Sequence, residues 1–168
     1  MKTGPAILVL LGIVLIGALM FMPRTPGGEE DDAVGSAMHE TLDHSYSIAD
    51  SLVDVALQKL ESGELPPMQA VLSIRDVAEK FPENIKANFT LGVMSMQTGQ
   101  YEKAQERFLK VLKSDAQNLD AHLLLARAKT SIGDSLGAIE SLESALETLS
   151  SEETKNAIRE ELASINPN

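Results

Sequence analysis

The residues best suited to chemistry are a small group of histidines and acids: His39, Glu40, Asp43 and His44. On a helix His39 would share a face with Asp43, and Glu40 with His44, because residues four apart lie on the same side. Each face then offers two ligands, half of the set that a structural zinc site uses. A metal hydrolase built on these residues is the enzymatic alternative, and the simpler interpretation is a solvated helix.

Other catalytic patterns are missing from the sequence. The chain contains no Cys, which excludes a thiol nucleophile, a thiolate metal site and a disulfide framework. It also lacks a glycine-rich phosphate loop and a nucleophile elbow. We therefore expect a protein that is not an enzyme and that uses no cofactor and no metal.

The strongest pattern is an internal repeat with an offset of 34 residues between Asn84 and Leu149. Small and apolar residues recur at this offset in the pairs Ala87 and Ala121, Leu91 and Leu125, Gly92 and Ala126, Gly99 and Gly133, Ala104 and Ala138, Phe108 and Leu142, Val111 and Ala145, and Leu112 and Leu146. A fixed period with small residues where helices cross and a glycine at the turn predicts an all-α helix-turn-helix solenoid.

The elements of this solenoid can be placed along the chain. Apolar residues at helical spacing predict helices over 86–98, 100–114, 119–132 and 134–149. Gly99 and Gly133 can adopt the left-handed conformation that ends a helix. Ser150 and Ser151, one of which can cap, are followed by Glu152 and Glu153, and this pattern predicts a last helix over 152–164 that covers the end of the stack.

These residues resemble the tetratricopeptide repeat (TPR) family over about Ser51 to Glu152. The match in the second repeat is carried by Leu91, Gly92, Gly99, Tyr101, Ala104, Phe108, Val111 and Asp115. The first repeat fits less closely, through Leu57, Ala70, Ile74, Val77, Pro82 and Asn84, and its turn glycine Gly63 comes two residues early. The aromatic that the family has in the first helix is replaced by Asp54, Asn88 and His122. We predict three repeats, 51–84, 85–118 and 119–152, the first degenerate, followed by a capping helix and tail over 153–168.

The N-terminus predicts a membrane anchor. Residues 6–22 are almost wholly apolar, and as a helix they span about 26 Å, slightly less than the hydrocarbon core of a bilayer. A cleaved signal peptide is the alternative, although cleavage near Ala18 would leave an apolar end exposed. Lys2, in the short end 1–5, favours a cytoplasmic N-terminus, which would put the repeats in the periplasm.

Two segments join the anchor to the repeats. Residues 23–36 are rich in Pro, Gly and acids and predict a flexible acidic linker. Residues 37–50 predict a leading helix, and the helical pattern continues to Ser62 as one long helix or two short ones.

Charge is unevenly distributed along a chain whose net charge is -11. Residues 29–64 hold ten acids and one base, 65–133 seven acids and nine bases, and 134–168 eight acids and two bases. The mildly basic middle could steer an acidic segment of a partner, or it could be a solvated face. Nucleic acid binding is not expected, because it needs a sustained basic surface.

The resemblance implies a concave groove lined by the first helix of each repeat, where a protein or peptide partner would bind. The implied groove residues are Val55, Lys59, Lys86, Phe89, Thr90, Val93, Gln97, Asp120, Leu123, Leu124, Arg127 and Ser131. Their mixture of apolar and charged side chains suits an extended or helical peptide.

The sequence thus favours a single-pass inner-membrane protein, anchored in the bilayer through residues 6–22, whose periplasmic TPR domain is an adaptor for another protein. The layout is similar to that of small TPR proteins that accompany secretion machinery and envelope chaperones. The alternatives are an assembly factor for c-type cytochromes that binds apoprotein, and an organelle-membrane receptor with a cytosolic TPR domain. Self-association through the exposed edge of the first repeat is a further possibility.

Overall fold

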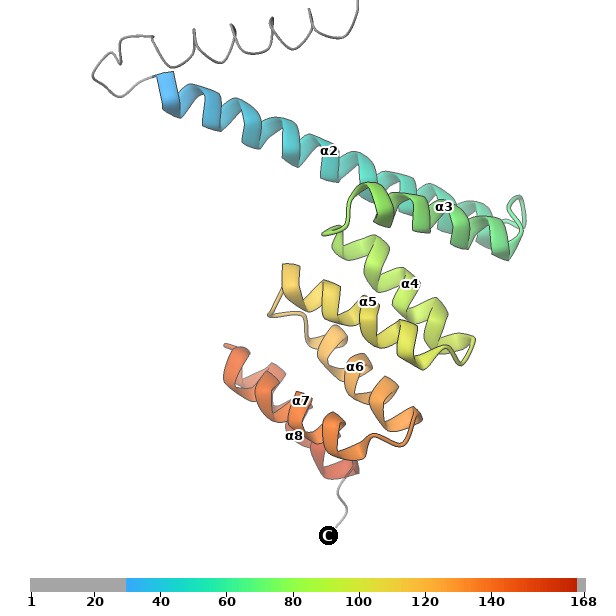
Figure 1. Cartoon of the computed structure of the whole chain (residues 1–168), viewed down its shortest axis with the longest axis vertical. Coiled ribbons are helices and arrows are strands. Elements are labelled where there is room, and N and C mark those ends of the chain that lie inside the picture. The colour runs from blue at the N-terminus through green and yellow to red at the C-terminus, as the bar shows by residue number, and fades with distance from the viewer. Residues whose placement is uncertain (1–29, 166–168) are drawn as a thin grey trace, which may run out of the picture. The chain divides into compact units, whose positions relative to one another are not determined.

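The protein is all-α in the part that the structure describes. The computed structural model describes the backbone of residues 30–165 and the side chains of residues 44–165. The helices are α2 Glu30–Glu61, α3 Pro67–Lys80, α4 Ile85–Gln97, α5 Tyr101–Ser114, α6 Leu119–Ser131, α7 Ser135–Thr148 and α8 Glu152–Ile165 (Figure 1). The predicted all-α class is confirmed, and α4 to α8 begin and end within about one residue of the predicted bounds.

The N-terminal predictions are only partly covered. The anchor 6–22 and the short end 1–5 lie outside the described residues. Within residues 30–165, the structure contains no helix that combines the length and the apolar character needed to cross a bilayer.

The chain divides into two compact units after Glu40, and residues 30–40, the start of α2, are the described part of the first unit. Because α2 begins at Glu30, the last residues of the predicted linker are helical instead of flexible.

In the second unit the helices stack in chain order. From α3 to α8 each helix packs against the next one, and α8 also contacts α6 (Figure 1). The apolar core follows the same order in three clusters, the first formed by α2, α3 and α4, the next by α4, α5 and α6, and the last by α6, α7 and α8. A core divided between successive helix pairs is the mark of a solenoid, which confirms the predicted architecture.

Turns and caps of the same kind recur along the stack. Gly63, Gly99 and Gly133 have φ values of 76°, 71° and 86°, in the left-handed region that glycine adopts without strain. The side chains of Asn84 and Asn118 cap α4 and α6 by accepting hydrogen bonds from the backbone N–H groups of Ala87 and Ala121, at 2.7 and 3.0 Å.

Helices α4 and α5 approach each other closely at Gly92. A Cβ atom added to Gly92 would lie 2.6 Å from Cε1 of Phe108, a fully buried side chain. In the third repeat the two equivalent positions hold Ala126 and Leu142, both fully buried in the cluster of α6, α7 and α8. From repeat two to repeat three the first-helix residue becomes larger, from glycine to alanine, and the second-helix residue becomes smaller, from phenylalanine to leucine.

The first repeat departs from this arrangement. Gln58, which is equivalent to Gly92 and Ala126, is exposed, whereas Val53 and Ala56 are buried against α3 and α4. A glutamine does not fit where glycine or alanine allows two helices to touch, so α2 presents a different face to the stack.

The other end of the stack is closed by α8. Ile158 is fully buried beside Leu142 and Leu149, and Leu162 and Ile165 pack around the same cluster. The Ser151 hydroxyl accepts a hydrogen bond from the backbone N–H of Glu153 at 3.2 Å at the start of the helix.

The crossing generates a stability prediction. We expect Gly92→Ala to lower the free energy of unfolding by about 1–3 kcal/mol, because its Cβ would clash with the Phe108 ring. In a Phe108→Leu background, which has the second-helix residue of the third repeat, the same change should instead stabilise by up to about 1 kcal/mol, since alanine is the better helix former. Urea unfolding of the four proteins of this cycle measures the difference. Equal effects of Gly92→Ala in both backgrounds would contradict the proposed contact.

Candidate partner-binding site

The apolar residues predicted to line the groove lie largely in the interior. The rings of Phe89 and Phe108 make an edge-to-face contact, with their centroids 5.9 Å apart. Val93 and Leu124 pack against the same cluster, and Leu123 packs against the cluster of α6, α7 and α8. These side chains are half-buried, so they join the first helices to each other and offer a partner only part of their surface.

Two predicted basic residues have partners within the chain. Lys86 Nζ donates a hydrogen bond to Asp54 Oδ2 at 2.6 Å, which ties α4 to α2. The Arg127 guanidinium binds both carboxylate oxygens of Glu161, with Nε–Oε1 and Nη2–Oε2 distances of 2.9 Å. This two-point contact joins α6 to α8.

A shallow pocket of about 530 Å³ brings part of the predicted set together. It lies across α4, α6 and α8 and includes Arg127 and Ser131 of the predicted residues. The other lining residues are Met96, Thr130, Ser135, Glu161, Ser164 and Ile165. We call this pocket the inner pocket, because its main walls are the first helices of repeats two and three and the capping helix.

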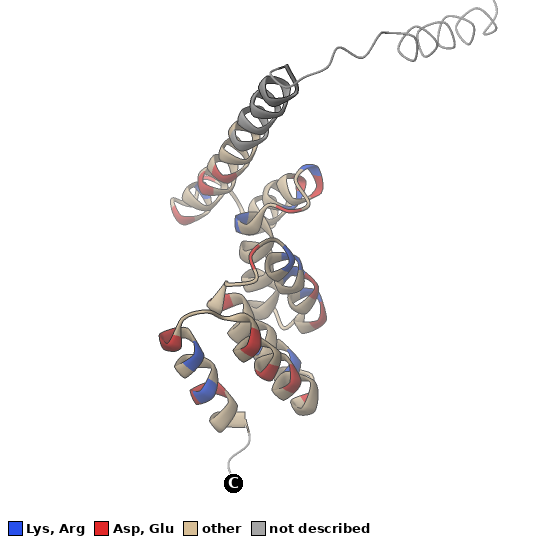
Figure 2. Ribbon diagram, turned by 90° about the vertical axis from the view of Figure 1, so that its left-hand side faces the viewer, with Lys and Arg blue, Asp and Glu red and all other residues tan. Residues whose placement is uncertain are grey.

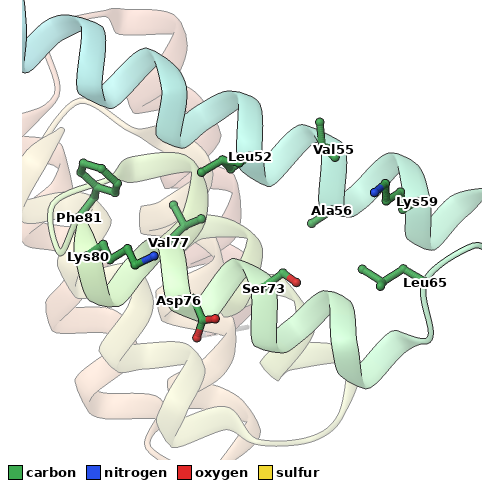
Figure 3. A pocket seen from close by; sticks show the side chains of 10 residues that line it. All are labelled: Leu52, Val55, Ala56, Lys59, Leu65, Ser73, Asp76, Val77, Lys80 and Phe81. Carbon is green, nitrogen blue, oxygen red and sulfur yellow. The ribbon is translucent and has the colours of Figure 1, made fainter.

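Val55 and Lys59 lie elsewhere. They line a second pocket, of about 310 Å³, between α2 and α3, together with Leu52, Asp76 and Lys80 among others (Figure 3). We call it the end pocket, because α4 contributes no residue to its lining. Asp54, the α2 residue that binds Lys86 of α4, is not part of the lining either. The structure therefore does not join Val55 and Lys59 to the inner pocket.

The remaining predicted residues are spread along the first helices. Gln97 and Asp120 are exposed near helix ends, and Thr90 is half-buried within α4. None of these three lines the inner pocket.

The Arg127–Glu161 pair is the main electrostatic feature of the inner pocket. The hydrogen bonds from Arg127 lower the pKa of the Glu161 carboxyl below its ordinary value of 4.5, and burial opposes this shift. The same hydrogen bonds raise the pKa of Arg127, so both groups are charged at neutral pH. The Glu161 side chain is 15% exposed, whereas that of Arg127 is 55% exposed and can still be reached from solvent.

The sequence reasoning missed six residues of the inner pocket, of which Glu161 is the one with a recognisable signal. Glu161 lies 34 residues after Arg127, so it occupies the same position in α8 that Arg127 occupies in α6. That offset was a usable signal, because it places α8 in register with the first helices of the repeats.

Polar residues stand where the family has an aromatic, and they are hydrogen-bonded within the fold. Asn88 is buried, and its Nδ2 donates to the carbonyl oxygens of Pro82 and Asn84 while its Oδ1 accepts from Arg107 Nη1 at 3.0 Å. The His122 ring nitrogen Nε2 is hydrogen-bonded to the carbonyl oxygen of Ala116 at 3.1 Å.

Charge follows the helices unevenly (Figure 2). The acids of α7 are Glu140, Glu143 and Glu147, and this helix has no Lys or Arg. The charged residues of α5 are Glu102, Lys103, Glu106, Arg107, Lys110 and Lys113. The basic middle that the sequence indicated thus lies chiefly on the second helix of repeat two.

The histidine and acid group is only partly visible. No cluster of three or more His, Cys, Asp or Glu suited to a metal occurs among the described residues. The side chains of His39, Glu40 and Asp43 lie outside those residues, so the structure does not test the metal-site alternative.

The stacked helix pairs, the turn glycines and the small residues at the crossings define a helix-turn-helix repeat protein. Residues 69–128 match the model of the tetratricopeptide repeat family. The match begins in α3, in keeping with the different packing of α2. No curated protein sequence matches the chain.

Several solved structures share the fold. The chaperone SycD of type III secretion from Yersinia enterocolitica aligns with a TM-score of 0.58 at 17% identity, over 71% of this chain and 92% of SycD. SycD in complex with a peptide of the translocator YopD aligns at 0.55 and 18% identity, over 75% and 92%. A mutant form of MamA aligns at 0.56 and 19% identity, over 70% of this chain and 62% of the MamA chain. At sequence identities this low, the similarity shows a shared fold and nothing more.

The Arg127–Glu161 pair generates a pH prediction. Because the folded-state pKa of Glu161 is lowered, its contribution to stability is present above the ordinary carboxyl pKa and is lost as the pH falls through the folded-state value. We expect Glu161→Gln to lower the melting temperature at neutral pH and to have no effect once the carboxyl is protonated in both states. Thermal melts followed by circular dichroism across the acid range measure this. A constant difference at every pH would contradict an ionic role for Glu161.

Proposed function

We propose that this protein is a non-enzymatic adaptor that binds a segment of another protein on its inner pocket and holds that partner at a membrane. The observation that carries the proposal is the inner pocket itself, in which α4, α6 and α8 each present residues to one shared hollow. Pockets between the first helices of a repeat array suit an extended or helical peptide, because successive helices offer equivalent contacts along its length.

The chemistry of the pocket sets the kind of segment that fits. Met96 and Ile165 provide apolar contact at its two sides, while Thr130, Ser131 and Ser164 offer hydroxyl groups. Arg127 keeps guanidinium N–H groups beyond the two that bind Glu161, and these can bind a carbonyl or a carboxylate of the segment. The SycD structure with a YopD peptide supports peptide binding as a use of this fold.

The membrane part of the proposal rests on the sequence. Residues 6–22 have the length and the apolar character of a short membrane span. Lys2 before this segment, with only Arg24 soon after it, favours a cytoplasmic N-terminus and therefore a periplasmic repeat domain. A tethered adaptor would keep its partner close to the bilayer, which raises the effective concentration of the partner there.

Partner binding is tested by filling the inner pocket. We expect Ser131→Trp to reduce the recovery of co-purifying protein about tenfold, because the indole would occupy the space of the bound segment. The full chain is extracted from its native membrane in mild detergent, and the bound proteins are quantified by mass spectrometry. Phe89 and Arg127 are less suitable positions, since both make contacts that support the fold.

Ser144→Trp is the matched control for this experiment. Ser144 is exposed on α7 and does not line the inner pocket, so the same substitution there should leave recovery unchanged. Equal recovery by the wild type and by Ser131→Trp would exclude the inner pocket as the binding site.

The topology has its own test. If the repeats face the periplasm, protease added to intact spheroplasts should digest the domain that begins near Ser51 and leave a cytoplasmic marker protein intact. Antibodies against the C-terminal helix would follow the digestion. A domain that resists protease until the spheroplasts are lysed would place the repeats in the cytoplasm and contradict the proposed orientation.

A further inference from the structure

A third pocket opens between α3, α4 and α5. Its volume is about 410 Å³, and its apolar lining residues are Met68, Val71, Leu91 and Met94. Its polar lining residues are Arg75, Ser95, Thr98, Gln100, Lys103, Glu106 and Arg107. We call it the outer pocket, because its α4 residue Met94 and the inner-pocket residue Met96 are two positions apart and so point to nearly opposite sides of the helix.

The protein fills the equivalent place in the next repeat with one of its own side chains. Ser95 of the outer pocket corresponds to Lys129, which lies 34 residues later in the next repeat. The Lys129 side chain crosses to α7, where its Nζ donates to the carbonyl oxygen of Gly137 at 3.0 Å and also to the Ser141 hydroxyl. Gly137 and Ser141 are the equivalents of Lys103 and Arg107, so both ends of this contact have counterparts in the outer pocket.

This comparison shows what the outer pocket can accept. In repeat three a chain of four methylene groups occupies the space and a polar group ends it. In repeat two the short Ser95 side chain turns back to the carbonyl oxygen of Leu91 at 2.8 Å, which leaves that space open. An unbranched aliphatic or an aromatic side chain of a partner would therefore take the volume that Lys129 takes in its own repeat.

The rim of the outer pocket carries more basic than acidic side chains. Arg75, Lys103 and Arg107 stand around the opening with a single acid, Glu106. Their present contacts are to Glu79, Gln100 and Asn88, at 3.6, 2.6 and 3.0 Å, and each cation has further N–H groups to donate. A ligand that combines an apolar side chain with acidic neighbours matches both the floor and the rim.

We propose that the outer pocket binds an acidic segment of a partner protein, by taking one aromatic or long aliphatic side chain of that segment between α3, α4 and α5 while flanking carboxylates contact Lys103 and Arg107. This surface is separate from the inner pocket, so the adaptor has two binding surfaces on opposite sides of its first helices. Nucleic acid is a poor match, because residues 65–133 carry seven acids as well as nine bases, and phosphate contacts need a sustained basic surface.

The experiment uses the full chain in mild detergent and a defined probe, a fluorescein-labelled peptide of four glutamates around one phenylalanine, followed by fluorescence anisotropy. We expect saturable binding by the wild type that is lost when glycine replaces the phenylalanine of the probe. Ser95→Met should weaken binding about tenfold, because the new side chain would fill the pocket as Lys129 does in repeat three. Lys103→Gln should also weaken it, since it removes one rim charge.

Two control variants match these changes. Ser131→Met makes the same substitution at an inner-pocket serine whose hydroxyl is also bonded to the carbonyl oxygen four residues earlier, at 2.8 Å, and it should leave probe binding unchanged. Lys155→Gln removes one charge from α8, away from the pocket, and should likewise have no effect. Circular dichroism melts confirm that each variant is folded.

Three outcomes would overturn the proposal: no saturable binding of the probe, equal binding by Ser95→Met, or a loss of binding in Ser131→Met. The last result would place the acidic peptide in the inner pocket. Because the partner-recovery experiment alters only the inner pocket, failure of one assignment is distinguishable from failure of the other.

Discussion

The stack depends on how closely the first helix of a repeat can approach the second. In repeat two the approach is set by Gly92 against the Phe108 ring, where there is no room for a Cβ atom. In repeat three Ala126 and Leu142 solve the same problem with a larger residue on one side and a smaller one on the other. Two helices at this distance form an apolar surface on which the following helix packs. Each cluster of the core therefore joins helices that follow one another in the chain.

The sequence predicted the parts of the fold that depend on this constraint. Helix bounds and turn glycines in repeats two and three follow from the 34-residue offset, because each repeat has to meet the next with the same geometry. It predicted less of the first repeat, whose register is set by packing against α3 and α4. There Gln58 holds the position of Gly92, and the periodicity of α2 could not show that Val53 and Ala56 would be buried in its place.

The candidate site was predictable as a face but not as a set of free side chains. A repeat position tells which side of a helix a residue occupies, not whether a neighbour has already engaged it. Phe89 and Val93 are on the predicted helix and are held by the cluster around Phe108. Arg127 is on the predicted face, but its partner Glu161 lies in α8, which looked like a cap outside the repeats even though it keeps their register.

Because the helix geometry is the same in repeats two and three, a residue that differs between them can be compared directly at equivalent positions. At the first-helix position where the family has an aromatic, Asn88 and His122 both make hydrogen bonds within the fold. At the position of Ser95 and Lys129 the outcome differs between repeats, since the long side chain closes its own site and the short one leaves a lined hollow. In a solenoid, a pocket can therefore form where one repeat has a short side chain at a position that a long side chain fills in the next repeat. Comparison of equivalent positions within one chain locates such pockets.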